Sequence, residues 1–277
     1  MDLNAIKARL QQMEEKSGNN REKVDYEKVF WRPPMGKSKI RIVPSAYDPT
    51  MPFSELKFHY NVGKYPMLAL SNFGKQDPVE EFVAELKKTN DRDNWSLAGK
   101  LTPRSRFFAP VVVRGEESEG VKLWQFGKEI YEAFLQMASD EEIGDYTDII
   151  NGRDIKLTTV GPESTGTPYN KTSIGPSMKT SALSDNEETV KLLLEEQADP
   201  MKVFKALSYD EMKASLQEWL SPEDSEEEDD IISEPAEDFD SDEKKSNYSL
   251  DTTTTTVKKS KSQQFDDLFG EEDDMPF

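Results

Sequence analysis

Basic and aromatic residues interleave in one stretch of the chain, between Arg92 and Lys128. Its members are Arg92, Trp95, Lys100, Arg104, Arg106, Phe107, Phe108, Arg114, Lys122, Trp124, Phe126 and Lys128. A single-stranded nucleic acid needs this mixture, because cations follow the phosphates and flat rings stack on exposed bases, at roughly 1–3 kcal/mol per base. The same composition also suits the core of a small barrel, since alternate residues of a strand face opposite sides. We therefore expect some of these rings to point inward.

Catalytic chemistry has little support in the sequence. His59 is the only histidine and the chain has no cysteine, so a thiol nucleophile is excluded and any Ser-His-Asp triad would need His59 as its base. There is no Gly-rich phosphate loop and no dinucleotide fingerprint. Carboxylates are plentiful, but none stands out as a catalytic pair. We expect no enzymatic activity, with a carboxylate-dependent nuclease as the enzyme class that stays open.

Charge is distributed unevenly along the 277 residues, although the whole chain has a net charge of −20. Residues 221–277 hold 20 Asp/Glu against 5 Lys/Arg, whereas residues 21–128 hold 19 Lys/Arg against 14 Asp/Glu. The acidic tail has too little apolar area to offset the entropy of ordering, so we expect it to be disordered. Its scattered apolar residues are typical of tails that dock onto partners, and they are Phe239, Phe265, Leu268, Phe269 and Phe277.

Short strands broken by Gly and Pro would position the basic-aromatic stretch. We expect them at residues 39–43, 56–60, 67–70, 107–113, 121–126 and 153–160. Residues 121–126 alternate cleanly and suit a hairpin partner for 107–113. Several short strands of this kind predict an α+β protein with a small β-barrel core.

Amphipathic helices are expected between and around the strands. Apolar periodicity indicates helices at residues 78–88, 128–138, 186–197 and 209–220, with Ser184 and Ser208 as plausible N-caps. A further helix at residues 3–17 is too short to be stable alone, so it must pack on the core or grip a neighbouring copy. No apolar run approaches the ~20 residues of a membrane span, and the N-terminus lacks a signal-peptide core. A cytoplasmic protein is expected.

Five segments, in this order and spacing, resemble the T-even-type phage single-stranded-DNA-binding (helix-destabilising) protein family. They are residues 39–45, residues 52–53 with His59 shortly after, residues 94–97, residues 104–109, and residues 119–128, which end in Phe-Gly-Lys. The resemblance covers about residues 20–180. It implies an OB-type barrel with a basic cleft, built by residues 21–220, between an N-terminal arm of residues 1–20 and the acidic tail of residues 221–277.

The same resemblance implies a function and a set of site residues. Proteins of this family coat single-stranded DNA cooperatively and without sequence preference during phage DNA replication, recombination and repair of DNA damage, in the host-cell cytoplasm. The family's aromatic cleft positions fall on Trp95, Phe107, Phe108 and Trp124. Its basic positions fall near Lys100, Arg104, Arg106, Lys122 and Lys128, and Arg41 is a looser candidate.

Protein partners are implied at both ends of the chain. The arm would mediate self-association along DNA, and the tail would bind replicative polymerase, helicase-primase and recombination proteins. The last residues, Asp273, Asp274, Met275, Pro276 and Phe277, resemble the ending of bacterial single-stranded-DNA-binding proteins. In such docking the Phe277 ring fills a pocket while its carboxylate meets a basic rim. We also expect a tail of net −15 to compete with DNA for a cationic cleft.

A metal site of the family is degenerate in this sequence. The family type holds a zinc ion with one histidine and three cysteines. His59 stands at the histidine position, and the cysteine positions fall on Ser71, Asp77 and Glu80. Thiolates dominate structural zinc sites, so we expect no cofactor and no zinc here. Apolar packing would hold this region instead, through Phe73, Val79, Phe82, Val83 and Leu86.

One alternative function belongs to a different class. The chain would then be an acidic scaffold or chaperone-like protein, whose tail binds basic partners and whose core never touches DNA. Quenching of Trp fluorescence by single-stranded DNA, relieved by salt, distinguishes DNA binding from this alternative.

Overall fold

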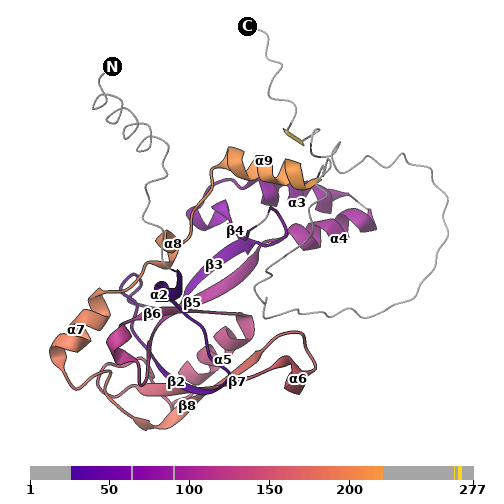
Figure 1. The fold of residues 1–277 in the computed structure, drawn as a ribbon. Helices are drawn as coiled ribbons and strands as arrows, with labels where there is room; N and C mark the ends of the chain where they lie inside the picture. The colour runs from indigo at the N-terminus through magenta and orange to yellow at the C-terminus, as the bar shows by residue number, and fades with distance from the viewer. Residues whose placement is uncertain (1–25, 64, 90, 221–264, 266–267, 270–277) are drawn as a thin grey trace, which may run out of the picture.

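The computed structural model describes residues 26–63, 65–89, 91–220, 265 and 268–269. The helix expected at residues 3–17 and the chain end at residues 273–277 lie outside this part. The described chain combines helices with an 8-stranded sheet, which confirms the α+β prediction (Figure 1). Among these residues, no helix combines the length and apolar character needed to cross a bilayer.

The eight strands form one mixed sheet. They are β1 (Phe30–Trp31), β2 (Gly36–Ile42), β3 (Ser54–His59), β4 (Met67–Leu68), β5 (Arg104–Val113), β6 (Lys122–Phe126), β7 (Arg153–Val160) and β8 (Lys171–Thr180). The order is β1-β6-β5-β2-β7-β8, and β3 pairs with both β4 and β5. β1 runs parallel to β6, and the other pairs are antiparallel. The predicted hairpin is confirmed, because Phe107 pairs with Phe126 and Val111 with Lys122.

β5 is the strand on which both halves of the molecule depend. Its C-terminal half pairs with β2, from Val111 to Val113, and its N-terminal half pairs with β3, from Arg104 to Phe108. Figure 1 shows β3 and β5 leaving the rest of the sheet side by side and reaching the helices at the other end. One continuous strand therefore sets the relative position of the two halves.

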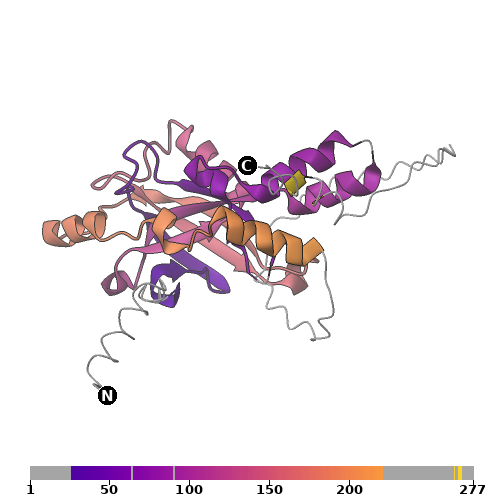
Figure 2. The ribbon, with the colours of Figure 1, turned by 90° about the horizontal axis from the view of Figure 1, so that it is seen from above.

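The helices match the apolar periodicity in part. They are α2 (Tyr26–Val29), α3 (Pro78–Lys88), α4 (Arg92–Leu101), α5 (Lys128–Ala138), α6 (Pro162–Thr165), α7 (Glu187–Glu195), α8 (Pro200–Val203) and α9 (Tyr209–Leu220), with 3-10 turns η1 (Leu70–Phe73) and η2 (Glu117–Glu119). Within the described residues, α3, α5, α7 and α9 lie where apolar periodicity predicts helices, whereas α2, α4, α6 and α8 were not predicted. The predicted ranges of α3, α5 and α9 are confirmed residue for residue. Figure 2 shows α7 at one end of the molecule and α3 and α4 toward the other.

Side-chain caps explain where two of these helices begin. Asn186 caps α7, because its Oδ1 accepts from Glu188 N at 2.8 Å. Ser184 is therefore not the cap, and its hydroxyl accepts from Asn186 N at 3.2 Å instead. Before α9 the predicted cap is confirmed: Ser208 Oγ accepts from Glu211 N at 3.2 Å while Glu211 Oε2 accepts from Ser208 N at 2.8 Å. This reciprocal pair is a capping box.

Two large apolar cores define two lobes. We call β1, β2, β6, β7, β8 and α5, with the C-terminal half of β5, the sheet lobe. We call α3, α4, α9 and β4 the helical lobe. The sheet-lobe core includes Trp31, Ile40, Ile42, Phe107, Val111, Trp124, Phe126, Phe134, Ile155 and Leu157. The helical-lobe core includes Met67, Val79, Phe82, Val83, Leu86, Leu97, Leu101, Met212 and Leu216.

A third cluster lies between the lobes, on β3 and the middle of β5. Its buried members are Leu56, Phe58, Leu68 and Phe108, with Phe30, Tyr60, Phe73, Met201 and Phe204 packed around them. Four of the five residues predicted to hold the helical lobe by apolar packing lie in that lobe's core, and Phe73 packs in the inter-lobe cluster instead.

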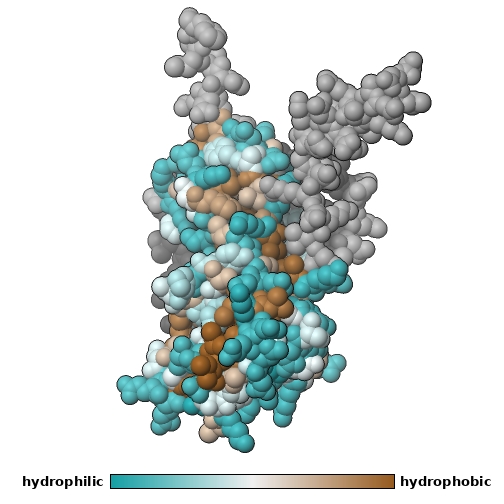
Figure 3. All heavy atoms as spheres, turned by 90° about the vertical axis from the view of Figure 1, so that its left-hand side faces the viewer, coloured by the Kyte–Doolittle hydropathy of each residue, from teal (hydrophilic) through white to brown (hydrophobic). Residues whose placement is uncertain are grey.

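Figure 3 shows the face on the left of Figure 1, where apolar residues form a diagonal band through a hydrophilic surround.

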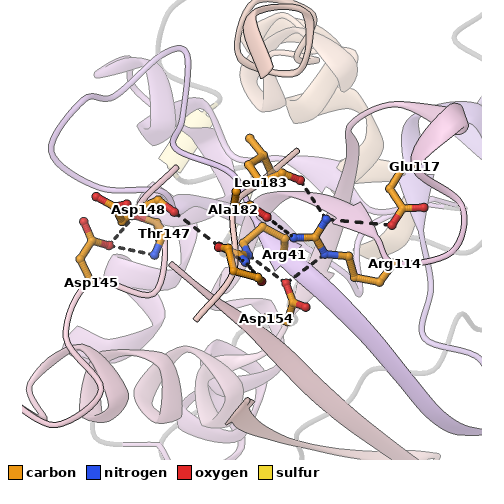
Figure 4. A network of polar contacts seen from close by, with 10 residues as sticks. Arg41, Arg114, Glu117, Asp145, Thr147, Asp148, Asp154, Ala182 and Leu183 are labelled. Carbon is orange, nitrogen blue, oxygen red and sulfur yellow. Dashed lines mark hydrogen bonds and ion pairs between the residues drawn. The ribbon is translucent and has the colours of Figure 1, made fainter. Parts of the chain in front are cut away.

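A partly buried ionic network joins three strands of the sheet lobe (Figure 4). Asp154 Oδ1 in β7 accepts from Arg41 Nε in β2 at 3.0 Å and from Arg114 Nε, just after β5, at 2.9 Å. Arg41 Nη2 also donates to Ser181 O at 2.8 Å, and Arg114 donates to two carbonyls of the segment after β8. Burial lowers the pKa of Arg41, while its bonds to Asp154 oppose that change. One carboxylate oxygen thus accepts hydrogen bonds from two guanidinium groups.

Replacing Asp154 with Asn tests the importance of this network. We expect Asp154→Asn to lower the free energy of unfolding by about 3 kcal/mol, because a buried cation loses its counter-charge. Urea unfolding of the full chain gives this value. Asp185→Asn, at an exposed position, makes the same chemical change and should leave stability within about 0.5 kcal/mol. Equal stability of the two variants would contradict a structural role for the network.

Candidate nucleic-acid interface

Three of the predicted basic residues lie on the two elements next to the end of β3. Asn61 follows β3, and its Nδ2 donates to Lys100 O near the end of α4 at 2.7 Å. In the β3–β5 ladder, Phe58 pairs with Arg104 and Leu56 pairs with Arg106. The Lys100 backbone therefore lies beside Asn61, the residue after Tyr60, and Arg104 and Arg106 lie on the strand that pairs with β3. We call Tyr60, Lys100, Arg104 and Arg106 the strand-end cluster.

Arg106 is held against the ring of Tyr60. Its Cζ lies 5.2 Å from the ring centroid, and its Nε donates to Tyr60 Oη at 3.0 Å. Arg106 is 6% exposed, so the contact lies in a largely desolvated place, where a cation–π interaction is strongest. Arg104 shares its face of β5, because residues two apart in a strand point the same way. The cluster thus offers fixed positive charge next to an aromatic ring.

Tyr60 was not singled out by the basic-aromatic pattern. It lies outside the stretch from Arg92 to Lys128, and only the β3–β5 register brings it to Arg106. The available signal was its place at the end of a predicted strand rich in aromatic residues.

Two exposed rings lie on the segments that adjoin this cluster. Trp95 in α4 is 55% exposed, and its Nε1 donates to Thr89 O at 3.0 Å, which fixes the indole. Tyr65 lies between β3 and β4 and is 71% exposed. Trp95 is the one exposed ring among the four aromatic residues predicted for the site. Tyr65 was missed, and its signal was an aromatic residue in a Gly- and Pro-containing connection.

The other three predicted rings lie in the interior. Phe107 stacks on Tyr131 with centroids 4.0 Å apart, and Trp124 meets Trp31 edge-on at 5.8 Å. Phe108 is fully buried in the inter-lobe cluster. Neighbouring residues of β5 are buried on both sides of the sheet because α5 covers one face and Phe204, after α8, covers the other. In this structure these rings shape the core and present no surface to a ligand.

The remaining predicted cations lie apart from one another. Arg41 is 0% exposed and belongs to the network with Asp154, so its guanidinium faces the protein. Lys122 begins β6 and forms an ion pair with Glu119. Lys128 begins α5, toward the Arg106 end of β5, and its Nζ lies 3.5 Å from Glu132 Oε1. Arg41 therefore has a structural role, because its guanidinium is paired with the Asp154 carboxylate, which lies 113 positions away in the sequence.

The degenerate zinc positions form a hydrogen-bonded cluster. The ligand atoms of His59, Asp77 and Glu80 lie within 4.8 Å of one another. Asp77 Oδ1 accepts from the backbone N of Val79 and Glu80 and caps α3. Asp77 Oδ2 accepts from Leu70 N at 2.8 Å and lies 3.1 Å from His59 Nε2. Both carboxylate oxygens therefore already have two partners each.

These residues do not fit the zinc site of the family. Ser71 Oγ donates to Glu80 Oε1 at 2.6 Å, so two of the former ligand positions satisfy each other. Structural zinc sites depend on thiolate ligands, and this chain has no cysteine. Burial alone would raise the pKa of the Asp77 carboxyl, but hydrogen bonds from His59 and from backbone N–H groups hold it below its usual range. The cluster works as a helix cap and a β3–α3 link.

The lowered pKa of Asp77 gives a pH-dependent prediction. A carboxyl whose pKa falls on folding contributes stability above its unfolded pKa of about 3.9, and this contribution is lost as pH falls through the folded value. We expect Asp77→Asn to lower the free energy of unfolding by about 2 kcal/mol at pH 7, with a smaller difference below pH ~4. Urea unfolding between pH 7 and 3 measures this. A difference that stays constant over that range contradicts the ionised cap.

The family comparison covers both lobes. The family model described as "gp32 DNA binding protein like" matches residues 35–221, which run from just before β2 to just after α9. This is more than half of the chain. Comparison with curated proteins finds no match. The predicted resemblance to the T-even-type phage single-stranded-DNA-binding family is thus confirmed, and the chain belongs to the gp32-like DNA-binding protein family.

Proposed function

We propose that this protein binds single-stranded DNA through the strand-end cluster and the exposed rings near it, and that it is not an enzyme. The observation that carries the proposal is the contact of Arg106 with Tyr60, with Arg104 on the same strand and the Lys100 backbone bonded to the neighbouring Asn61. Membership of a DNA-binding family supports the same conclusion. Cations follow a flexible phosphate chain wherever it runs, and rings stack on any base, so binding of this kind is independent of sequence.

The two parts of the interface have different tasks. Lys100, which is exposed, and Arg104 supply charge for phosphates, whereas the buried Arg106 keeps Tyr60 in place. Trp95 and Tyr65 offer exposed rings for stacking. Phe107, Phe108 and Trp124 act indirectly, because they pack β5 and β6 and so hold Arg104 and Arg106 in register.

Finer parts of the proposal extend beyond these residues. We assign the sheet lobe to an OB-type barrel, which is supported by β5 pairing with β3 and β2 in succession along one edge and with β6 along the other. The protein coats strands cooperatively through residues 1–20 and serves phage DNA replication, recombination and repair in the host cytoplasm. The tail binds replication and recombination proteins, with residues 273–277 as its hook. The helical lobe holds no zinc, which is supported by the donor set at His59.

Removing the phosphate contacts tests the interface. We expect Lys100→Ala/Arg104→Ala to weaken poly-dT binding and to reduce the slope of log K against log salt by about 1.4, since each phosphate contact on a single strand contributes roughly 0.7. Trp fluorescence quenching across a salt series measures both quantities. Lys191→Ala, an exposed lysine of α7, should leave them unchanged. No quenching of the native chain at low salt would instead favour the acidic scaffold.

Removing the exposed indole tests stacking separately. We expect Trp95→Ala to weaken binding of short oligo-dT about tenfold, with little change in salt slope, because a stacked ring contributes without charge. Trp95→Phe keeps a flat ring and should bind nearly as the native chain does. Fluorescence anisotropy of labelled oligo-dT measures all three proteins. Equal affinity of the Ala and native chains would remove Trp95 from the interface.

A further inference from the structure

Phe265 of the acidic tail lies in the core of the helical lobe, and Leu268 and Phe269 pack against that core. Phe265, Leu268 and Phe269 pack with the cluster that contains Phe82 and Leu216. Phe265 is 3% exposed, which is as buried as the core residues of α3 and α9. For these three residues the expected disorder of the tail is wrong, since they bury apolar area against a surface formed far earlier in the chain.

The contacts are specific to one face of a short helical segment. The Phe265 ring meets Phe82 of α3 edge-on at 6.1 Å and meets Phe269 at 4.7 Å. Residues 265, 268 and 269 are helical, and positions i, i+3 and i+4 of a helix share a face. Met212 and Leu216 of α9, both fully buried, lie in the same cluster.

Charge complements this apolar contact. Lys213 Nζ of α9 lies 4.8 Å from the centroid of the Phe269 ring and 3.4 Å from Phe269 O. A cation there combines a cation–π contact with favourable charge near a helix C-terminus. In the sequence, the three apolar residues are flanked by Asp266, Asp267, Glu271 and Glu272. The segment is thus acidic and apolar, and the surface is apolar with a lysine at its edge.

The surface is held in place independently of the tail. Tyr209 Oη of α9 donates to Glu81 Oε2 of α3 at 2.7 Å, and the capping box at Ser208 fixes the start of α9. The α3–α9 pair therefore offers a defined apolar surface, and docking of an amphipathic helix by its apolar face is a recurring mode of peptide recognition.

We propose that Phe82, Met212, Lys213 and Leu216 form a binding site for a short acidic helix with apolar residues at positions i, i+3 and i+4. Its occupant in the free protein is the chain's own Phe265, Leu268 and Phe269. Tethering gives this segment an effective concentration on the order of millimolar, which favours it over the same segment of another copy. A partner that takes the 265–269 segment must first displace it from this surface.

A peptide-exchange experiment tests the site. The probe is a fluorescein-labelled peptide of residues 262–272, titrated with the native full-length chain and with Phe265→Ala/Phe269→Ala. We expect the variant to bind the peptide at least tenfold more tightly, because its own tail segment no longer occupies the α3–α9 surface. Phe239→Ala, another tail phenylalanine, should bind as weakly as the native chain. Adding Lys213→Glu to the double variant should abolish binding, whereas adding Lys191→Glu should not.

Two results overturn the proposal. One is equal binding of the peptide by the native chain and the double variant, with both folded by circular dichroism. The other is hydrogen-exchange protection of α9 that rises with protein concentration. That result would place the 265–269 segment of a second copy on the α3–α9 surface. Protection that is independent of concentration and lost in the double variant supports the occupant named here. No DNA is present, so failure here is distinct from failure of the DNA-binding proposal.

Discussion

The Asp154 carboxylate is the group on which the arrangement of the sheet lobe depends. A single oxygen accepts from both Arg41 and Arg114, and the two guanidinium groups reach the segment after β8 (Figure 4). The fit is tight, because a Cβ at Gly152 would collide with Arg41 Nη1. β2, β5 and β7 are thus tied at one point, next to the C-terminal end of β5. Since β5 is continuous, fixing this end also sets the position of Arg104 and Arg106 at the other.

The length of β5 also explains which rings are available to a ligand. Its middle passes beneath packed aromatic residues on both faces, so Phe107 and Phe108 are buried on opposite sides. Only its first two residues, Arg104 and Ser105, are partly exposed, and the buried Arg106 lies between them and the packed rings. Exposed aromatic residues accordingly come from the helix and the loop that adjoin this end, as Trp95 and Tyr65 do. The buried rings supply rigidity, and in the proposed function this end of the strand and its neighbours supply charge and stacking.

Sequence patterns over short stretches predicted the elements whose formation depends mainly on local sequence. Strong apolar periodicity located α3, α5 and α9, and clean alternation located the β5–β6 hairpin. β8 was missed because Gly175 and Pro176 interrupt it and it has no apolar alternation. Because Arg41 lies between two apolar residues of a strand, alternation predicted an outward-facing side chain. Its actual partners, Asp154 and Ser181, are 113 and 140 positions away. The covering of Phe108 by Phe204 is likewise a long-range contact, which strand alternation cannot indicate.

The helical lobe connects the tail to the proposed interface. Leu97, Ala98 and Leu101 of α4 share one core with Phe82 of α3 and with Phe265 from the tail. α4 also carries Trp95 and Lys100 on its exposed side. Removing the Phe265 ring would therefore take a buried side chain out of the core that positions α4. The loss in free energy of unfolding would depend on how far α3 and α9 can close the resulting cavity. A protein that captures the tail would act on the DNA-binding surface through packing, in addition to any effect of the tail's charge.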